Sequence, residues 1–410
     1  MDDISVLIID DSALMRNLIS RIITEVEGLT VAGKAMNGAF GLEKIAQCNP
    51  DVIVLDIEMP VMTGIEFLKE RRKRNIHIPV IMMSSLTTEG AAITMECLDL
   101  GASDFITKPA AKSTGDLNSV ASRLVEMLFS YGGQYARRQG KKVPFVRQDL
   151  NLAVMRKKAE ESAASLRPPA QTLSSGSAAA AKQEQAARPS APVKLKPQFS
   201  TTSDTSAPVK ITPLREGGRV EIIALGISTG GPNALREVFK NISPDIKQPI
   251  LVVQHMPAGF TAEFARSLDS ICPLEVREAQ DGDLLKSGRV LIAPGNYHLY
   301  VERKSLASIA RLSSAEPCNG HRPSVDVLFE SVAKIYENRS LGVIMTGMGR
   351  DGAAGLAQMR KQGAHTLGQD EESSIVYGMP KVAYELGGVE RQVPLSQMAQ
   401  AISEVAKQFE

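Results

Sequence analysis

The sequence has no tryptophan, and phenylalanine and tyrosine together bring its aromatic content to only 4%. Broad aromatic platforms on which nucleic-acid bases stack are therefore not expected. Net charge is nearly absent as well, because 47 basic residues face 46 acidic ones and leave a formal charge of +1. This balance argues against a dedicated basic surface, so we expect no nucleic-acid partner.

Long apolar runs and paired cysteines are missing too. No stretch approaches 18 consecutive apolar residues, so we expect no direct insertion into a membrane. The first residues read M-D-D-I-S, an acidic start that is unlike a signal peptide. The four cysteines stand far apart and form no C-x-x-C pair. These features predict a reduced, cytoplasmic protein.

The length and the changes in composition predict two α/β domains joined by a linker. The 410 residues are too many for one compact core. Residues 1–130 predict a flavodoxin-like domain with a five-stranded parallel sheet, and residues 218–410 predict a second, doubly wound and mainly parallel domain. Most of residues 131–217 is rich in Ala, Ser, Pro, Gln and Thr, and this composition predicts a largely disordered linker. Within it, residues 150–166 are a candidate helix and residues 194–199 a candidate partner-binding segment.

Short apolar runs alternate with helix-like segments in both predicted domains. Runs of this kind, separated by amphipathic segments, predict strands buried on both faces of a parallel sheet. In the first domain the predicted strands are Val6–Ile9, Leu29–Val31, Val52–Leu55, Val80–Met83 and Phe105–Ile106. In the last domain they are Glu221–Leu225, Ile250–Val253, Arg289–Ile292, Leu341–Met345 and Ala364–Leu367.

Three aspartates follow predicted strands of the first domain. Asp10 and Asp11 end the first strand and Asp56 ends the third, so the three carboxylates are expected to converge at one edge of the sheet. Converging carboxylates repel each other unless a cation lies among them, and oxygen ligands suit Mg²⁺. Ser84 and Lys108 follow the fourth and fifth strands and complete a pocket suited to accept a phosphoryl group. A single loop aspartate often only caps a helix, but the full set favours the pocket.

Residues 1–125 resemble the receiver domain of bacterial response regulators over the whole fold. The resemblance implies that Asp56 accepts the phosphoryl group and that Asp10 and Asp11 hold Mg²⁺. A histidine kinase of a two-component system is the implied phosphodonor.

The same resemblance implies roles for four further positions. Ser84 and Lys108 correspond to the switch pair that responds to the phosphate, and Phe105 corresponds to the aromatic switch. Glu58 corresponds to the position whose backbone carbonyl also reaches the metal.

A serine stands at a sharp turn of the last domain. The segment G-I-S-T-G-G-P places Ser228 directly after a predicted strand and before a helix-like segment. Such a strand-to-helix turn exposes the hydroxyl, while backbone N–H groups point the same way. The arrangement is typical of a nucleophile beside an oxyanion hole.

Two further side chains follow predicted strands of the same domain. His255 comes after the second strand and is the best-placed base, with His321 as the second candidate. Asp351, in G-M-G-R-D-G, follows a later strand and is the candidate that orients the base. Each feature alone has another interpretation, since strand-end histidines are often structural and glycine-rich turns often bind phosphate. Together they predict a serine hydrolase whose chain order, Ser…His…Asp, differs from that of α/β-hydrolases.

Five motifs of residues 218–400 resemble the signatures of the chemotaxis protein-glutamate methylesterases, the CheB family. They are G-I-S-T-G-G-P, V-V-Q-H-M-P-A-G-F-T, A-P-G-N-Y-H, G-H-R-P-S-V-D-V-L-F and T-G-M-G-R-D-G-A-A-G. The resemblance implies that Ser228 is the nucleophile, His255 the base and Asp351 its orienter. The long linker departs from the family pattern and leaves the packing of the two domains open.

The resemblance also assigns residues around the triad. Thr229 and Met348 are implied to line the site, with the backbone N–H of Met348 as an oxyanion donor. A substrate-side loop is implied at His321, Arg322, Pro323 and Ser324.

The implied function is a phosphorylation-activated enzyme of chemotaxis adaptation. It would hydrolyse glutamate γ-methyl esters on chemoreceptors through an acyl-enzyme, and would also deamidate receptor glutamines. Mg²⁺ would serve phosphorylation of the receiver, whereas the esterase reaction would need no cofactor. The unphosphorylated receiver is expected to cover the esterase cleft.

Two other output functions could use the same residues, and the sequence argues against both. A nucleotide-binding domain would use the glycine-rich turns, but the sequence has no G-K-[ST] and no acidic ribose ligand after the second strand of the last domain. A DNA-binding regulator would need a basic recognition helix, which the C-terminal residues do not offer.

Overall fold

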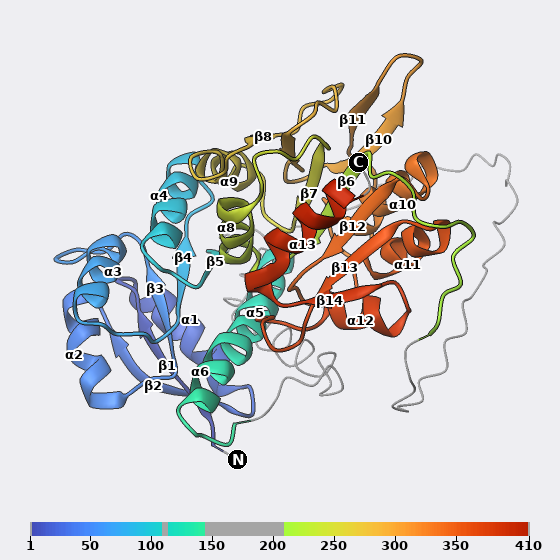
Figure 1. The fold of residues 1–410 in the computed structure, drawn as a ribbon. Helices are drawn as coiled ribbons and strands as arrows, with labels where there is room; N and C mark the ends of the chain where they lie inside the picture. The colour runs from blue at the N-terminus through green and yellow to red at the C-terminus, as the bar shows by residue number, and fades with distance from the viewer. Residues whose placement is uncertain (1, 109–113, 144–208, 409–410) are drawn as a thin grey trace, which may run out of the picture.

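The computed structural model of the protein describes residues 2–108, 114–143 and 209–408. These residues form two parallel sheets with helices on their faces, and the two halves pack against each other (Figure 1). The helix expected at residues 150–166 and the segment 194–199 lie outside the described residues. No helix of the described part of the chain has the length and apolar character needed to cross a membrane.

The first sheet has five parallel strands in the order β2-β1-β3-β4-β5, as the sequence predicts. Its strands are β1 (Ile4–Ile9), β2 (Leu29–Ala35), β3 (Val52–Asp56), β4 (Val80–Ser84) and β5 (Asp104–Thr107). Between them run α1 (Ala13–Thr24), α2 (Gly38–Cys48), α3 (Gly64–Lys73) and α4 (Thr88–Asp99). The central strands β3 and β4 are buried along their whole length, because helices cover both faces of the sheet.

Short polar side chains start the helices of this domain. Ser12, Asn37 and Thr87 each accept a hydrogen bond from a backbone N–H in the first turn of α1, α2 and α4. Thr63 and Glu66 form a reciprocal capping box at α3. Because each cap ends a loop at a defined residue, the loops that carry the aspartates are held close to the sheet edge.

The helix after β5 continues further than expected. It comprises α5 (Thr114–Met127), the π-helical turn η1 (Leu128–Gly132) and α6 (Gly133–Arg138). Tyr131 is buried, and Lys141 pairs with the buried Asp51 at 2.8 Å. The residues from 131 to 143, which composition places in the linker, therefore pack on the first sheet.

The second sheet has seven parallel strands in the order β14-β13-β12-β6-β7-β9-β8. They are β6 (Ile222–Ile227), β7 (Ile250–Gln254), β8 (Glu275–Glu278), β9 (Arg289–Ile292), β12 (Ser340–Ile344), β13 (His365–Gln369) and β14 (Arg391–Val393). The five strands predicted from the sequence are confirmed, and β8 and β14 are two short strands at the edges. The central neighbours β12, β6 and β7 bring their carboxyl ends to one edge of the sheet.

Helices and one hairpin surround this sheet (Figure 1). The helices are α8 (Gly231–Asn241), α9 (Phe260–Asp269), α10 (Val325–Tyr336), α11 (Ala353–Gln362), α12 (Met379–Glu385) and α13 (Leu395–Gln408). The strands β10 (His298–Arg303) and β11 (Ser308–Ser313) form an antiparallel hairpin that projects from the domain. The chain after β11 returns toward the sheet and enters α10.

The residues directly before the second sheet also pack on this domain. The Val209 N–H donates to the carbonyl of Glu385 at 3.1 Å, and the Leu214 N–H donates to the carbonyl of Lys361 at 2.8 Å. The stretch 209–217, expected as linker, is thus attached to α11 and α12.

Candidate active site and phosphoacceptor site

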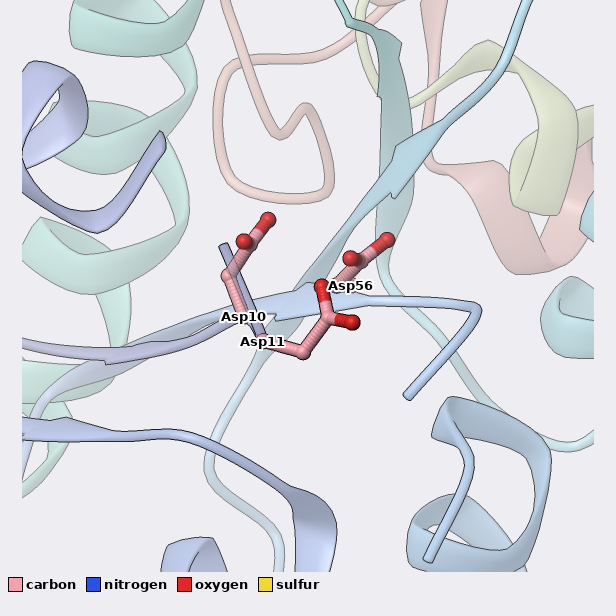
Figure 2. A group of neighbouring side chains, drawn as sticks. All are labelled: Asp10, Asp11 and Asp56. Carbon is pink, nitrogen blue, oxygen red and sulfur yellow. The ribbon is translucent and has the colours of Figure 1, made fainter. Parts of the chain in front are cut away.

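Three carboxylates meet at the carboxyl edge of the first sheet, as the sequence predicts (Figure 2). Asp10 and Asp11 follow β1, and Asp56 ends β3 beside it. One oxygen from each lies within 4.8 Å of the others. Asp10 and Asp56 are buried, whereas Asp11 is exposed to solvent.

Lys108 neutralises part of this charge. Its Nζ lies 2.6 Å from Asp56 Oδ2 and 3.5 Å from Asp10 Oδ2. Burial raises the pKa of the Asp56 carboxyl to about 6, because the bond from Lys108 only partly offsets the loss of solvation and the nearby charge of Asp10 raises the pKa further. The pocket therefore retains an excess of negative charge that a cation would relieve.

The donor set fits a magnesium ion. Asp10 Oδ2 is buried and accepts no hydrogen bond, and its only partner named above is Lys108 at 3.5 Å, so this oxygen is available as a ligand at the centre of the cluster. Glu58 is exposed in the loop after β3 and, with Asp11 and Thr63, lines a surface hollow next to the carboxylates. All-oxygen ligands of this kind are those that Mg²⁺ prefers.

Of the three expected switch residues, Lys108 contacts Asp56, whereas Ser84 and Phe105 have partners elsewhere. The Ser84 hydroxyl is fully buried and lies 2.7 Å from Thr94 Oγ1 and 3.2 Å from the carbonyl of Gly90, both on α4. Phe105 is also buried, and its ring stacks on that of Phe260 at 4.9 Å between centroids. Phe260 begins α9 of the other domain, so Phe105 lies at the contact between the two domains.

The second site is built where three neighbouring strands of the second sheet end. Ser228 follows β6, His255 follows β7, and Asp351 lies in the loop between β12 and α11. His255 Nδ1 lies 3.1 Å from Ser228 Oγ, and His255 Nε2 lies 2.8 Å from Asp351 Oδ2. The structure thus brings together the serine, histidine and aspartate selected from the sequence.

The turn at Ser228 is held on both sides. Its N–H donates to the carbonyl of Thr346 at 2.9 Å, and its carbonyl accepts from the N–H of Gly231 at 2.8 Å. The side-chain amide of Gln254 donates to the same carbonyl at 3.1 Å. Gly230 has a φ of +80°, a conformation that favours glycine and allows the chain to pass directly from the serine into α8.

Asp351 is buried and surrounded by donors. Oδ2 accepts from His255 and from the N–H of Val325 at 2.7 Å, and Oδ1 accepts from the Ser324 hydroxyl at 2.7 Å and from Asn319 Nδ2 at 2.9 Å. Burial alone would raise the pKa of this carboxyl, but the hydrogen bonds and the charge of His255 outweigh it and hold the pKa well below its usual range. Asp351 therefore stays ionised and aimed at the imidazole.

The residues expected to line the site lie near the triad. Thr229 is buried next to the serine, and Met348 is half-buried in the loop after β12. That loop passes close to Ser228, since a Cβ placed on Gly347 would stand 2.8 Å from the Ser228 Cβ. Backbone groups of this loop are consequently within reach of an atom bound to the serine.

The residues of the loop expected on the substrate side differ in their burial and in their partners. The His321 ring stacks on the His255 ring with 3.8 Å between centroids and 9° between planes, and Arg322 is half-buried and donates to the carbonyls of Ser314 and Ala315. Ser324, in contrast, is fully buried with its hydroxyl on Asp351, so the expectation that it faces a substrate is wrong.

Two groups of contacts near these sites were missed by the sequence analysis. Asn319 and Gln254 support the triad, although only the Asn-Gly pair at Asn319 carries a local signal, that of a tight turn. Asp104 is buried at the start of β5, and its Oδ2 accepts from the N–H of Gly230 at 3.0 Å and from the hydroxyl of Tyr131 at 3.0 Å. The receiver side thus contacts the helix that follows the serine.

Comparisons with known proteins show which families the chain resembles. Residues 223–402 match the CheB methylesterase family and residues 6–116 match the response regulator receiver domain. The chain is 51% identical, over the full length of both sequences, to a protein-glutamate methylesterase/protein-glutamine glutaminase of Treponema denticola. It is 50% identical to a protein of the same name from Treponema pallidum, over 100% of this chain and 98% of the relative. The solved catalytic domain of Thermotoga maritima CheB methylesterase is 37% identical, covers 46% of this chain and 99% of its own, and has a TM-score of 0.44.

Proposed function

The chain belongs to the family of CheB methylesterases, and on this basis we propose that it is a phosphorylation-activated protein-glutamate methylesterase. Its substrates are glutamate γ-methyl esters on chemoreceptors, and receptor glutamines are deamidated at the same site. The observation that carries the proposal is the hydrogen-bonded series Ser228–His255–Asp351 at the ends of three adjacent strands. A serine hydrolase requires such a series of nucleophile, base and orienting acid.

The reaction follows from the atoms that face each other. His255 Nδ1 takes the Ser228 proton as Oγ attacks the ester carbonyl, and ionised Asp351 stabilises the imidazolium that forms. Backbone N–H groups beside the serine, with Met348 as the proposed donor, hold the oxyanion. His255 then returns the proton to the departing methoxide, methanol leaves, and water hydrolyses the acyl-enzyme by the same steps.

Glutamine deamidation uses the same residues. Attack of Ser228 on a side-chain amide forms the same acyl-enzyme, and His255 protonates the leaving nitrogen so that ammonia departs. The esterase site needs protein groups alone for both reactions, which is why we propose no cofactor there. Thr229, His321 and Arg322 are the proposed side chains around the substrate.

Regulation is proposed at the first domain. Asp56 accepts the phosphoryl group from a chemotaxis histidine kinase, and Asp10, Asp11, Asp56 and the carbonyl of Glu58 would hold Mg²⁺. When bound, this ion supplies positive charge that neutralises the phosphate. Lys108 already contacts Asp56 and is placed to bind a phosphate oxygen. We propose that the protein acts in the cytoplasm, where such kinases and receptor domains meet.

Phosphorylation is proposed to loosen the contact between domains. Ser84 would leave Thr94 to bind the phosphate, and Phe105 would leave its stack on Phe260. In the structure Ser84 binds α4 within the receiver, and Phe105 contacts α9 of the esterase domain. We propose domain boundaries near residues 143 and 209, in place of 130 and 218, because the residues up to 143 and from 209 pack on the two domains.

The test is methanol release from methylated chemoreceptor, with and without a small-molecule phosphodonor and Mg²⁺. We expect release that rises with the phosphodonor in the wild type, no rise in Asp56→Ala, and loss of release in Ser228→Ala. The matched controls are Asp3→Ala and Ser270→Ala, which change exposed residues outside both sites. Full activity in Ser228→Ala would contradict the proposal.

A further inference from the structure

A tight turn connects the end of the hairpin to α10 and lies against the triad. The residues Cys318 and His321 exchange two backbone hydrogen bonds, of 3.1 and 2.9 Å. Between them, Asn319 and Gly320 have φ values of +52° and +80°. Two central residues with positive φ define a type I′ turn, for which Asn-Gly is the preferred pair.

The side chain of Asn319 joins two buried carboxylates. Its Nδ2 donates to Asp326 Oδ2 at 2.6 Å and to Asp351 Oδ1 at 2.9 Å. An amide group has two hydrogens, so one nitrogen serves both acceptors. Asp326 lies in the first turn of α10 and is itself held by the N–H of Gly355 at 2.7 Å. Asn319 therefore ties the turn to α10 and to the acid of the triad.

The same turn also contacts the base. His321 comes two residues after Asn319, and its ring lies parallel to that of His255 with 3.8 Å between centroids. One rigid turn thus touches Asp351 through an amide and His255 through a ring. A change in the position of the turn would move both partners of the imidazole–carboxylate pair.

We propose that Asn319 is a positioning residue for the esterase reaction. By binding Asp351 Oδ1 it leaves Oδ2 aimed at His255 Nε2, and by anchoring the turn it keeps the His321 ring against the base. The proposal rests on the proposed function, because that function identifies the reaction. The contacts of Asn319 are observed in the structure whatever the reaction is. Asn319 touches no reacting atom and acts through Asp351 and His321.

The first test is Asn319→Gly, which removes the amide while allowing the positive φ without steric cost. The expected result is a fall in kcat of about 10- to 100-fold, the range that loss of a hydrogen bond to a charged group produces, with KM within about twofold of the wild type. Asn75→Gly is the matched control, because Asn75 is exposed in the receiver and also has a positive φ, of +55°. A kcat for Asn319→Gly within about twofold of the wild type overturns the proposal.

A second variant separates positioning from simple anchoring. Exchanging the two side chains, as Asn319→Asp with Asp326→Asn, restores a donor and an acceptor between the turn and α10. It also places a carboxylate instead of an amide next to Asp351. We expect the melting temperature of the exchanged variant to return toward that of the wild type while kcat stays low. Recovery of kcat to wild-type values would show that anchoring the turn is sufficient, and would overturn the proposal even if Asn319→Gly does not fold.

A third measurement needs no chemoreceptor, so its result does not depend on the test of the proposed function. A fluorophosphonate reagent labels a serine that is activated by its histidine and acid, so its rate on the full-length protein with phosphodonor and Mg²⁺ reports on the triad alone. We expect labelling at Ser228 to slow by about the same factor as kcat in Asn319→Gly. If the wild type is labelled but releases no methanol, the proposed substrate is wrong, and the labelling rates of the variants still decide the role of Asn319. Equal labelling rates in the wild type and Asn319→Gly overturn the proposal.

Discussion

Asp351 combines two properties that oppose each other, full burial and a negative charge. A buried carboxylate without partners would take up a proton, because the loss of solvation is large. Here the side chains of His255, Ser324 and Asn319 and the first N–H groups of α10 donate to its two oxygens. These donors replace water and keep the charge in place beside the base.

A pH-dependent stability difference follows for Asp351→Asn. A carboxyl whose pKa is lowered by folding stabilises the folded protein at pH values above the ordinary carboxyl pKa of about 3.9. This contribution is lost as the pH falls through the lowered pKa. At pH 7 we expect the free energy of unfolding of the variant to be lower than that of the wild type by at least about 2 kcal/mol. Part of this loss arises because the neutral amide places its own N–H groups against several donors. The deficit should shrink below pH 4, because the unfolded wild type takes up a proton there while the folded wild type keeps Asp351 charged.

Urea unfolding of the full chain, followed by circular dichroism between pH 7 and pH 3, measures this difference. Asp245→Asn is the control, because the side chain of Asp245 is 73% exposed and makes only a surface pair with Lys407. A deficit for Asp351→Asn that is constant over this range would contradict the assignment of a lowered pKa.

The residues that follow strands could be predicted from the sequence, and those that support them could not. Ser228 and His255 come directly after an apolar run and Asp351 lies in the short loop after a third, and parallel strands bring such positions to one edge. Asn319 lies far from any strand of the second sheet, so its pairing with Asp351 depends on the path of a loop. Ser324 was misplaced for the same reason, since a motif in sequence does not show which of its side chains faces inward.

Five helices around the second sheet, α8 to α12, begin without a side-chain cap from their own N-cap residue. Three of these five receive a carboxylate from another element instead. Asp104 binds the N-terminus of α8, Asp351 that of α10 and Asp326 that of α11. Helix N-termini carry unpaired N–H groups and partial positive charge, so these contacts both satisfy the helices and fix their positions around the site.

At α4 the structure predicts an effect of Thr94 on activation. The hydroxyl of Thr94 holds Ser84 in the unphosphorylated state, so Thr94→Val removes a bond that Ser84 must break to reach the phosphate. One hydrogen bond is worth about 1 kcal/mol, which shifts a two-state equilibrium about fivefold. We expect half-maximal methanol release at a correspondingly lower phosphodonor concentration.

Thr94→Ser is the control for this prediction, because it keeps the hydroxyl and loses only a methyl group. The two variants are compared by titrating the phosphodonor at fixed Mg²⁺. If both respond like the wild type, the bond between Thr94 and Ser84 does not contribute to the switch.

The strands and helices themselves were predictable where their apolar pattern is long. The central strands of both sheets are buried on two faces and read as apolar runs in the sequence. The edge strands β8, with four residues, and β14, with three, carry charged and exposed positions and lack such a run. They form because a neighbouring strand offers backbone hydrogen bonds. Such bonds do not depend on the side chains, so the amino-acid composition does not predict these two strands.

At the scale of the whole molecule, the receiver contacts the esterase domain next to the nucleophile. Phe105 stacks on Phe260, and Asn233 Nδ2 of α8 donates to the carbonyls of Ala102 and Ser103 at 3.0 and 2.9 Å. Arg236 of the same helix pairs with Asp99 of α4. The composition of the linker predicts two domains but not this contact, because its partners are more than 100 residues apart in sequence.

The carboxylate of Asp104 allows this contact to be tested by two variants with opposite expected effects. It bonds the N–H of Gly230, two residues after the serine, and burial raises its pKa above the usual value. Asp104→Ala removes the acceptor and leaves α8 without its partner, so we expect methanol release without phosphodonor to rise several-fold as docking weakens. Asp104→Asn keeps an acceptor oxygen and removes the cost of burying a charge, so basal release should be equal to or below that of the wild type.

The pH dependence of the same contact follows with a definite sign. Burial raises the pKa of Asp104 although the Gly230 N–H lowers it, and we attribute this burial to docking. The docked state then holds the proton more tightly, so docking is favoured at low pH and weakens as the pH rises through the raised value. The basal rate of the wild type divided by that of Asp104→Asn should therefore increase with pH above about 4, the ordinary carboxyl value. Taking the ratio removes the titration of the triad, which both proteins share. A ratio that does not change with pH, together with an unchanged basal rate in Asp104→Ala, would mean that the receiver restrains the esterase through Phe105 and Asn233 without the charge of Asp104.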